Sequence, residues 1–456
     1  MTGVVPTVWK IARVTALHKG GSNVLNNFRP ISILPILSKV LERVAFNQLY
    51  PYLNTNGLIN VHQSGFRPLH STETALLNTT DDWLGEFDKG NVVVAVMLDL
   101  EGAFDTIDHE LFTNKLFYYG LDENSVKWFK NYLEGRTQTT CINGNSSQFR
   151  PITCGIPQGS ILGPLMFIIH INDLPSVLKH CKVSVYADDT MLYCSGKDPR
   201  DVCRKINEDL ERVRIWLLRN KLHLNMKKTE YITFGNKQRL EKINDNNFDI
   251  QINRTLIRRV KECKHLGVLL DENLTWHSHI NTLQKKLRGG LFMLKSIRNI
   301  VNKNILLTVY NSLIMSHLSY CDVVWGNCGV TNQNVLQKFQ NRAARVINNA
   351  EWNSSATENL GILNWLTLDE KRKENIAIMM FKILSGRAPE YLIDKFSFRE
   401  HGYNTRSGSL HLNIPHPKTE ALKRSFVYRG ALYWNSLTHD QQQCTSLSRF
   451  KRFLTK

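Results

Sequence analysis

Residues 182–195 read KVSVYADDTMLYCS, two short apolar runs on either side of a turn that contains Asp188 and Asp189. We interpret the runs, 183–186 and 191–194, as two strands joined by that turn. Two adjacent carboxylates at the tip of a hairpin cannot both point into a core, because burying unpaired charge costs too much free energy. They are therefore either solvated turn residues or ligands of cations, and the tetrapeptide YADD alone favours the solvated turn.

A third aspartate, Asp99, directly follows the apolar run VVVAVML at 92–98. A strand this apolar is predicted to be buried, so the residue at its end faces a crevice at the edge of the sheet. Taken alone, Asp99 could equally cap the segment that follows. The three aspartates together fit nucleotidyl transfer, which uses two divalent cations about 3.5–4 Å apart. Carboxylates are the ligands that such hard cations prefer.

The chain has 456 residues, a net charge of +18 and 42% hydrophobic residues. This length and composition allow a large core and more than one domain. The positive charge favours a polyanionic partner, nucleic acid before an anionic membrane surface, although a basic protein without such a partner is an equal alternative. Residues 331–456 hold 19 Lys and Arg against 10 Asp and Glu, which is half of the excess charge in about a quarter of the chain.

The nine cysteines are scattered and contain no CxxC pair, which argues against a disulfide framework or a zinc ribbon and indicates a reducing compartment. Cys321 and Cys328, with His317 nearby, resemble a metal cluster most closely, but the apolar residues between them favour a packed core segment. The N-terminus has no signal-peptide pattern, and the longest apolar stretches are too short to span a bilayer. We therefore expect a soluble, intracellular protein without membrane contact.

The order of predicted elements is helices, a buried strand, helices, a hairpin, a helix, further strands and then an α-rich tail. The hairpin at 138–149 has Asn143-Gly144 as its turn, and a Gly- and Pro-rich loop at 153–160 opens an apolar helix. Strands are predicted at 92–98, 183–186, 191–194, 231–234 and 265–270. Helices are predicted at 32–54, 71–88, 109–119, 123–134, 199–220, 280–300, 304–318 and 332–348.

Seven blocks between residues 14 and 276 resemble, in order, motifs of the reverse transcriptases of non-LTR (LINE-type, jockey-like) retrotransposons. LDLEGAFDTIDH (98–109) resembles motif A, GIPQGSILGPLMFIIHINDL (155–174) motif B and YADDTMLY (186–193) motif C. The other four blocks are LHKGGSNVLNNFRPISILPILSKVLE, HQSGFRPLHSTETAL, LHLNMKKTEYITF and HLGVLLDENLTW. The resemblance implies an α+β right-hand polymerase. Its expected parts are fingers and a palm with an antiparallel sheet (1–275), a helical thumb (276–350) and a basic C-terminal region (351–456).

The resemblance also implies roles for residues that match the motifs. Asp99, Asp188 and Asp189 match the metal ligands of the family, which hold two Mg²⁺ ions, with Mn²⁺ as a substitute. Phe104 matches the aromatic gate that excludes a ribose 2′-OH; without the resemblance, a core aromatic is the better interpretation. Lys228 matches the motif D lysine that protonates pyrophosphate, with its neighbour Lys227 as an alternative. The nearby carboxylates Asp105 and Asp108 are interpreted as capping or structural groups.

The substrate side of the site is expected to use loop and fingers residues. Gln158 and Gly159 match the loop that approaches the incoming nucleotide, where glycine lets the backbone come close. Lys19 and Arg29 resemble the fingers cations that hold the triphosphate, and arginine suits phosphate because it binds two oxygens at once. Arg67 is a weaker candidate for the same role or for contact with the template.

The resemblance therefore predicts an RNA-directed DNA polymerase that uses an RNA template, a DNA primer and dNTPs in a cytoplasmic ribonucleoprotein, in the nucleus or in both. Two alternatives stay open: a catalytically idle remnant that binds nucleic acid, and an RNA-directed RNA polymerase. Elements of this type usually carry an endonuclease ahead of the polymerase, and Met1 lies about 15 residues before the first matching motif. From this we expect no nicking of a genomic target by this chain.

Overall fold

A five-stranded sheet carries the turn with Asp188 and Asp189. In the computed structural model, which describes residues 3–20, 27–241, 243, 249–399 and 410–454, its order is β14-β11-β3-β9-β8. All neighbours in it are antiparallel except β11 and β14. The sheet is therefore the antiparallel palm sheet that the sequence predicted. Its strands are β3 (Val92–Leu98), β8 (Lys182–Tyr186), β9 (Asp189–Gly196), β11 (Glu230–Phe234) and β14 (Arg258–Arg259).

Strand β3 is apolar throughout because helices cover both faces of the sheet. Val93 and Ala95 belong to one core cluster, shared with α2, whereas Val94 and Val96 belong to a second, shared with α5 and α6. Successive side chains of a strand point to opposite faces, so a strand buried on both sides shows no alternation. The helices around this sheet are α2 (Thr72–Asp88), α3 (His109–Tyr118), α4 (Glu123–Leu133), α5 (Leu162–Ile171) and α6 (Pro199–Arg219).

A second sheet, of order β2-β1-β5-β6 with β7 paired to β5, forms the fingers with helix α1. The helix predicted from residue 32 was wrong at its start, because Ser32 and Ile33 pair with β1 and α1 begins only after Pro35. The residue before a proline is disfavoured in helical geometry, so the chain stays extended up to Pro35. The elements are β1 (Ile11–His18), β2 (Phe28–Ile33), α1 (Ile36–Thr55), β5 (Thr137–Ile142), β6 (Asn145–Ser146) and β7 (Arg150–Pro151).

The apolar residues that recur at helical spacing in the first half of α1 are mostly on the surface. Leu37, Val40 and Val44 are 59%, 56% and 51% exposed, whereas the buried face of the helix includes Glu42. One Glu42 carboxylate oxygen accepts hydrogen bonds from the Tyr132 hydroxyl, and the other accepts one from the Ile161 N–H. A charged group with such partners can be buried, so this helix does not follow the hydrophobic pattern.

The hairpin at 138–149 is confirmed, with its turn at Asn143-Gly144 in left-handed geometry. The single strand predicted at 265–270 was wrong. The chain makes a tight hairpin there, because Leu266 and Gly267 both have positive φ. The small elements are η1 (Thr7–Lys10), β4 (Leu100–Glu101), η3 (Leu174–Val177), β10 (His223–Leu224), α7 (Lys237–Leu240), β12 (Gln251–Ile252), β13 (Thr255–Leu256), β15 (Glu262–His265) and β16 (Val268–Asp271).

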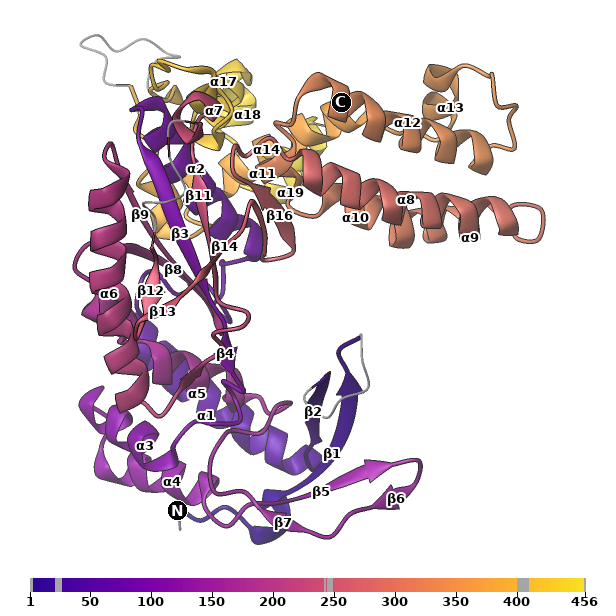
Figure 1. Ribbon diagram of the computed structural model, residues 1–456. Helices are drawn as coiled ribbons and strands as arrows, with labels where there is room; N and C mark the ends of the chain where they lie inside the picture. Colours follow the sequence, from indigo (N-terminus) through magenta and orange to yellow (C-terminus); the bar gives the residue numbers. More distant parts are fainter. Residues whose placement is uncertain (1–2, 21–26, 242, 244–248, 400–409, 455–456) are drawn as a thin grey trace.

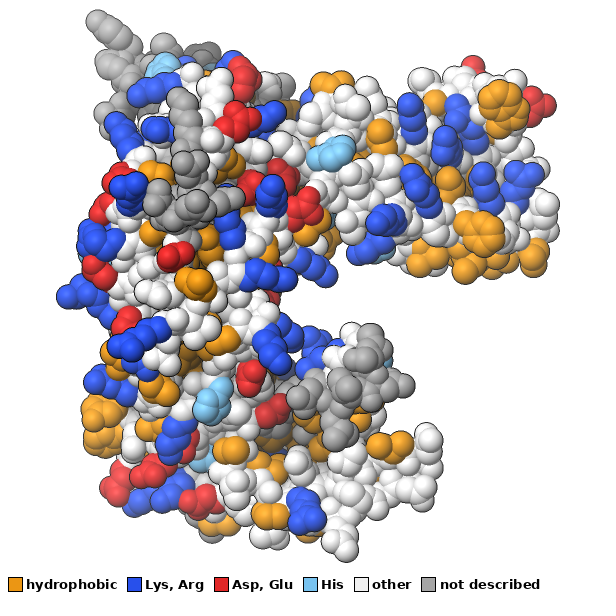
Figure 2. Space-filling model, in the orientation of Figure 1, with side chains coloured by type: hydrophobic (Ala, Val, Ile, Leu, Met, Phe, Trp, Pro, Cys, Tyr) orange, Lys and Arg blue, Asp and Glu red, His pale blue; other side chains and the backbone are white. Residues whose placement is uncertain are grey.

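Helices after residue 276 form an arm that projects from the top of the palm, opposite the fingers (Figure 1). The single helix predicted at 304–318 is interrupted by a π-helical turn at Asn311–Met315. An open cleft separates this arm from the fingers in Figure 2. The arrangement is that of a right hand. The helices are α8 (His277–Ile297), α9 (Lys303–Tyr310), α10 (Ser316–Ser319), α11 (Asp322–Trp325), α12 (Val330–Ile347) and α13 (Ala356–Ile362).

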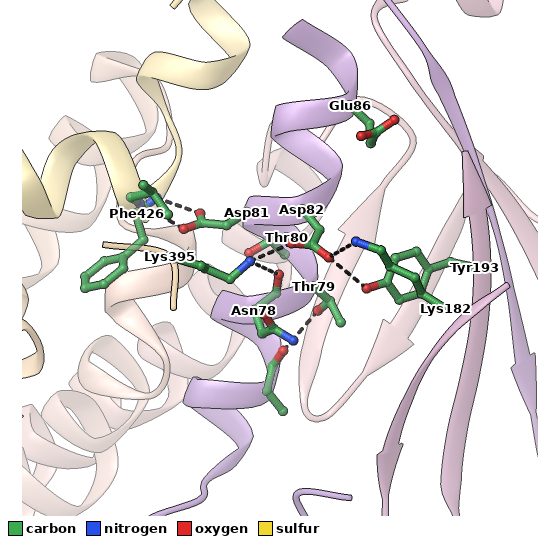
Figure 3. Close-up of polar contacts among 12 residues, drawn as sticks. Asn78, Thr79, Thr80, Asp81, Asp82, Glu86, Lys182, Tyr193, Lys395 and Phe426 are labelled. Atoms are coloured by element: carbon green, nitrogen blue, oxygen red, sulfur yellow. Dashed lines mark hydrogen bonds and ion pairs between the residues drawn. The ribbon is translucent and has the colours of Figure 1, made fainter. Parts of the chain in front are cut away.

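The C-terminal region packs against helix α2, on the side away from the sheet (Figures 1 and 3). Asp82 of α2 accepts hydrogen bonds from Lys395, Lys182 and Tyr193, and so ties this region to β8 and β9. Its neighbour Asp81 accepts the first N–H groups of α17. The helices are α14 (Leu368–Leu384), α15 (Glu390–Ile393), α16 (Glu420–Lys423), α17 (Phe426–Ser436), α18 (His439–Gln442) and α19 (Leu447–Leu454).

Candidate active site

The turn between β8 and β9 consists of Ala187 and Asp188, and Tyr186 pairs with Asp189 across it. Ala187 adopts a left-handed conformation with φ of 56°, which is uncommon for a residue with a side chain. This geometry places Asp188 at the tip of the hairpin and Asp189 at the first position of β9. Asp99 follows β3, whose last residue, Leu98, pairs with Thr190 of β9. The sheet therefore brings the three predicted carboxylates to one edge.

A loop from the fingers side holds this turn. The Gln63 Oε1 accepts hydrogen bonds from the N–H groups of Gly65 (2.7 Å) and Ala187 (3.1 Å). The Ser64 N–H donates to the carbonyl of Val185 at 2.8 Å. A Cβ atom on Gly65 would lie 2.3 Å from the Ala187 nitrogen, so a side chain at this position would displace the turn.

The three carboxylates act on one another electrostatically. Burial raises the pKa of Asp188, and the negative charge of Asp99 adds to this effect. Burial and the charges of Asp188 and Asp99 raise the pKa of Asp189 to about 6, while Arg29 opposes the rise. Such an excess of negative charge is neutralised by cations. Within the described residues, no group of three or more Asp, Glu, His or Cys side chains lies close enough together to hold one metal ion.

Lys228 is the cation next to Asp99, with 3.8 Å between its Nζ and the Asp99 Oδ2. The backbone holds the two segments together, because the Asn225 N–H donates to the Asp99 carbonyl at 2.8 Å. The structure thus places Lys228 beside Asp99, and its role in proton transfer stays a prediction. Its side chain is 69% exposed, which leaves it free to reorient toward a substrate.

The loop with Gln158 and Gly159 packs against the fingers strand β2. The Gln158 carbonyl accepts the Ser32 N–H at 2.7 Å, and a Cβ on Gly159 would lie 2.6 Å from the Ser32 carbonyl oxygen. The Gln158 side-chain amide donates to both carboxylate oxygens of Asp105, at 2.9 and 3.0 Å. Burial raises the pKa of Asp105, and Gln158 and Lys19 oppose this rise. Asp105 therefore orients Gln158, consistent with its predicted structural role.

Phe104 lies between two other rings. It stacks on Phe167, with 4.5 Å between ring centroids, and meets Phe66 edge-on at 6.3 Å. The side chain is half-buried, so one part packs in the core and another is open to solvent. The other motif A carboxylate, Asp108, caps helix α3 through the Leu111 N–H, which confirms its predicted capping role.

The guanidinium of Arg67 is directed at its own loop. Its Nη1 donates to the carbonyls of Asn60 and Gln63, at 3.1 and 3.0 Å. Arg67 therefore supports the segment that carries Gln63. Contact of Arg67 with phosphate or template stays a prediction.

The comparison with protein families matches residues 17–270, more than half of the chain, to the model described as "Reverse transcriptase (RNA-dependent DNA polymerase)". The chain belongs to the reverse transcriptase family. The matched segment contains all ten residues predicted for the site, from Lys19 to Lys228.

Similar proteins come from retrotransposons of Drosophila melanogaster. This chain is 28% identical over 370 residues to the RNA-directed DNA polymerase from mobile element jockey, covering 77% of this chain and 39% of the relative. It is 28% identical over 362 residues to the probable RNA-directed DNA polymerase from transposon X-element, covering 76% and 38%. The relative from transposon BS is 29% identical over 387 residues, covering 80% and 41%. The chain thus spans about two fifths of the length of these relatives.

Among solved structures, the chain is similar to apo telomerase from Candida tropicalis, with a TM-score of 0.40 and 12% identity, covering 76% of this chain and 59% of that one. Telomerase from Candida albicans, in complex with a fragment of telomeric RNA, gives a TM-score of 0.38 and 10% identity, covering 81% and 63%. Within the described residues, no helix is both long and apolar enough to cross a membrane.

Sequence reasoning missed the supports of the turn, Gln63 and Gly65. Both residues lie in the block HQSGFR, from which the sequence predicts a functional role for Arg67 alone. The signal was the glycine, which indicates close backbone approach, beside a buried amide. Cys321 and Cys328 are free, buried cysteines, as expected of a packed core segment.

Proposed function

We propose that this chain is an RNA-directed DNA polymerase that joins dNTPs to the 3′-OH of a DNA primer on an RNA template. The observation that carries the proposal is the convergence of Asp99, Asp188 and Asp189 at one sheet edge, where burial and neighbouring carboxylates raise the pKa values of Asp188 and Asp189. The edge lies between the fingers and the arm, where a cleft is open to a long ligand (Figure 2). A site with so much negative charge suits cations that carry a polyphosphate.

We infer that Asp99, Asp188 and Asp189 hold two Mg²⁺ ions, for which Mn²⁺ can substitute. The fit rests on the donor set, three carboxylates without a sulfur or imidazole, which is the set that hard cations prefer. When bound, the ions supply activation of the attacking hydroxyl and stabilisation of the leaving pyrophosphate. Gln63 holds the backbone of the turn that carries Asp188, so cation binding requires the carboxylates to move closer together but leaves the turn in place.

Other residues of the chain bind and orient the substrates. Arg29 and Lys19 contact the triphosphate from the fingers, and the Gln158–Gly159 loop lies under the nucleotide. Lys228 moves a proton to the pyrophosphate from its position beside Asp99. Phe104, held by Phe167, excludes a 2′-OH and thereby selects deoxynucleotides.

We also propose how the chain is divided into domains and where in the cell it acts. Residues 1–275 form the fingers and palm, 276–350 the thumb that grips the primer–template duplex, and 351–456 a C-terminal region of retrotransposon type. We propose that the protein acts on RNA in a cytoplasmic ribonucleoprotein, in the nucleus or in both.

Primer extension by the purified chain tests this function. With an RNA template, a DNA primer, Mg²⁺ and dNTPs, we expect extended DNA, and Asp188→Asn should abolish it. Omission of divalent cations should have the same effect. If the intact chain binds RNA but extends nothing under conditions where an active reverse transcriptase works, it is an idle remnant. If rNTPs are incorporated more efficiently than dNTPs, it is an RNA polymerase.

The gate can be tested separately in the same assay. Phe104→Val should raise incorporation of rNTPs relative to dNTPs by at least about tenfold, because it frees the space of the 2′-OH. Phe66→Leu is the matched control, since Phe66 only touches the Phe104 ring from its edge. An unchanged ratio in Phe104→Val would remove Phe104 from nucleotide selection.

A further inference from the structure

A groove of about 480 Å³ lies on the arm between helices α8 and α12. This volume is within the range of about 300–1,000 Å³ found for ligand sites. Five basic side chains line it and no acidic one does. They are Lys295, Arg298, Lys338, Arg342 and Arg345.

These five cations are available to a ligand. Among the described residues, no carboxylate lies within ion-pair distance of any of the five side chains. The Arg345 side chain alone among the five makes a hydrogen bond within this part of the chain, from its Nε to the Ser354 carbonyl at 2.9 Å. Elsewhere the chain pairs its cations readily, as Lys371 with Glu374 and Lys373 with Asp369. Like charges gathered without counterions repel, so binding of a polyanion relieves the repulsion and releases counterions.

An aromatic side chain lies in the same lining. Trp352 follows the end of α12 and is 88% exposed, although a large apolar ring is usually covered. Cations beside an exposed indole are the two components with which proteins bind single-stranded nucleic acid, through phosphate contact and base stacking. Glu351 precedes Trp352 in the chain but does not line the groove.

The groove differs from the edge of the arm that faces the fingers. In Figure 2, Lys and Arg side chains gather over α8 and α12 on the face turned to the viewer, whereas hydrophobic side chains gather along the lower edge of the arm. The exposed apolar residues of α8, α9 and the turn between them are Phe292, Met293, Ile300 and Ile305. The arm therefore presents an apolar edge to the cleft and a basic groove on its flank.

We propose that the groove between α8 and α12 binds a single-stranded polynucleotide outside the primer–template cleft, with phosphates on the five cations and a base stacked on Trp352. The choice of ligand rests on the proposed polymerase function, because the ligand is the single strand that continues beyond the primer–template duplex. A concave site fits a narrow strand better than a flat membrane surface. A duplex offers no free base face to the indole.

Direct binding to 20-nucleotide single strands tests the groove without requiring catalysis. Fluorescence anisotropy with RNA and DNA strands of mixed sequence measures affinity between 50 and 300 mM salt. Lys338→Ala/Arg342→Ala should weaken binding at least about tenfold at 0.1 M salt and lower the salt slope by about 1.4, since each phosphate contact on a single strand contributes about 0.7. The strand, RNA or DNA, whose affinity falls more between the unaltered chain and the groove variant is the ligand of the groove.

Trp352→Ala should weaken binding at least about fivefold with the salt slope unchanged, and Trp352→Phe should restore most of the affinity, because a ring still stacks. The matched control is Lys197→Ala/Arg200→Ala, which removes the same charge from exposed residues at the start of α6. Circular dichroism should show the same fold for all variants.

The proposal is overturned if the groove variants bind both strands like the control variant. It is also overturned if they lose binding only to vesicles that contain anionic lipid. Its failure is distinguishable from failure of the polymerase function, because primer extension by the unaltered chain would then persist. Loss of extension by the unaltered chain, with groove-dependent strand binding intact, would overturn the polymerase function alone.

Discussion

Two sets of three aspartates lie on opposite sides of the palm, and their surroundings differ in one respect. Asp99, Asp188 and Asp189 face the cleft with Lys228 as the nearest cation, at 3.8 Å from Asp99. Asp81 and Asp88 of α2 face the C-terminal region, and Asp82 lies between that region and the palm strands; each accepts at least two hydrogen bonds. The donors are backbone N–H groups, lysines and hydroxyls.

Burial raises the pKa of Asp81 to about 6 even with its donors, but the charges that act on Asp82 and Asp189 differ in sign. Lys395 and Lys182 hold the pKa of Asp82 below its usual value despite its burial. Burial, together with the charges of Asp188 and Asp99, instead raises the pKa of Asp189 to about 6. The same residue type thus joins two parts of the chain where donors surround it, and forms a candidate cation site where they do not.

The largest expected effect separates the two sets by activity. Asp99→Asn should lower primer extension at least about a thousandfold and leave the melting temperature nearly unchanged, because it removes a cation ligand and breaks only an exposed ion pair with Lys228. Asp82→Asn should retain extension within about tenfold but melt at a lower temperature. Single-turnover extension and thermal melting measure both. Equal losses of activity in Asp99→Asn and Asp82→Asn would mean that the two sets of aspartates do not differ in function.

The next effect concerns stability. Asp81→Ala leaves the N–H groups of Phe426 and Val427 without their acceptor, and each buried unsatisfied donor costs about 1–3 kcal/mol. We expect unfolding in urea to become easier by about 2–4 kcal/mol. Asp394→Ala, which removes an exposed carboxylate from the same region, should change stability by less than about 0.5 kcal/mol. A similar result for both would mean that Asp81 does not hold α17.

Glu73, at the other end of α2, provides a contrast within the same helix. Burial and the charge of Asp322 raise its pKa to about 7, so the folded chain keeps this proton to higher pH than the unfolded chain. Stability is therefore lost as pH rises between about 4.5 and 7. Glu73→Gln should be more stable than the unaltered chain by about 1–2 kcal/mol above pH 7, with solvent screening allowed for, and equal below pH 4. Urea titrations across this range measure the difference.

The smallest effect belongs to the exposed partner of Asp82. Lys182 is 67% exposed, and an exposed ion pair contributes about 0.2–1 kcal/mol. Lys182→Ala should therefore cost less stability than Lys395→Ala, whose side chain is 16% exposed and also donates to the Asn78 carbonyl. The reverse order would place the main attachment of Asp82 on the palm strands instead of the C-terminal region.

The sequence predicted the palm and its carboxylates because short-range patterns specify them. The apolar run before Asp99 and the two apolar runs around Asp188 predict strands from local sequence alone. The fold around α1 was harder to predict: Glu42 is buried because of donors from Tyr132 and Ile161, which lie about 90 and 119 positions further along the chain. A periodicity rule cannot include partners so distant in sequence.

The candidate site was predicted residue by residue from motifs, and this method finds groups that touch substrates. It missed Gln63 and Gly65, whose role is to hold a turn more than 120 residues away. It also missed the division of the arm into an apolar edge and a basic groove. That division depends on how α8 and α12 pack, since the residues of the groove are spread over positions 295–352.

The attachment of the C-terminal region to α2 has a consequence for synthesis of the chain. Asp81 and Phe426 are 345 positions apart, and a ribosome that adds about 5–20 residues per second needs roughly 17 to 70 s to make the segment between them. For that time Asp81 and Asp88 of α2 lack the partners that the last helices provide. We therefore expect the nascent chain to bind a chaperone until its last helices emerge.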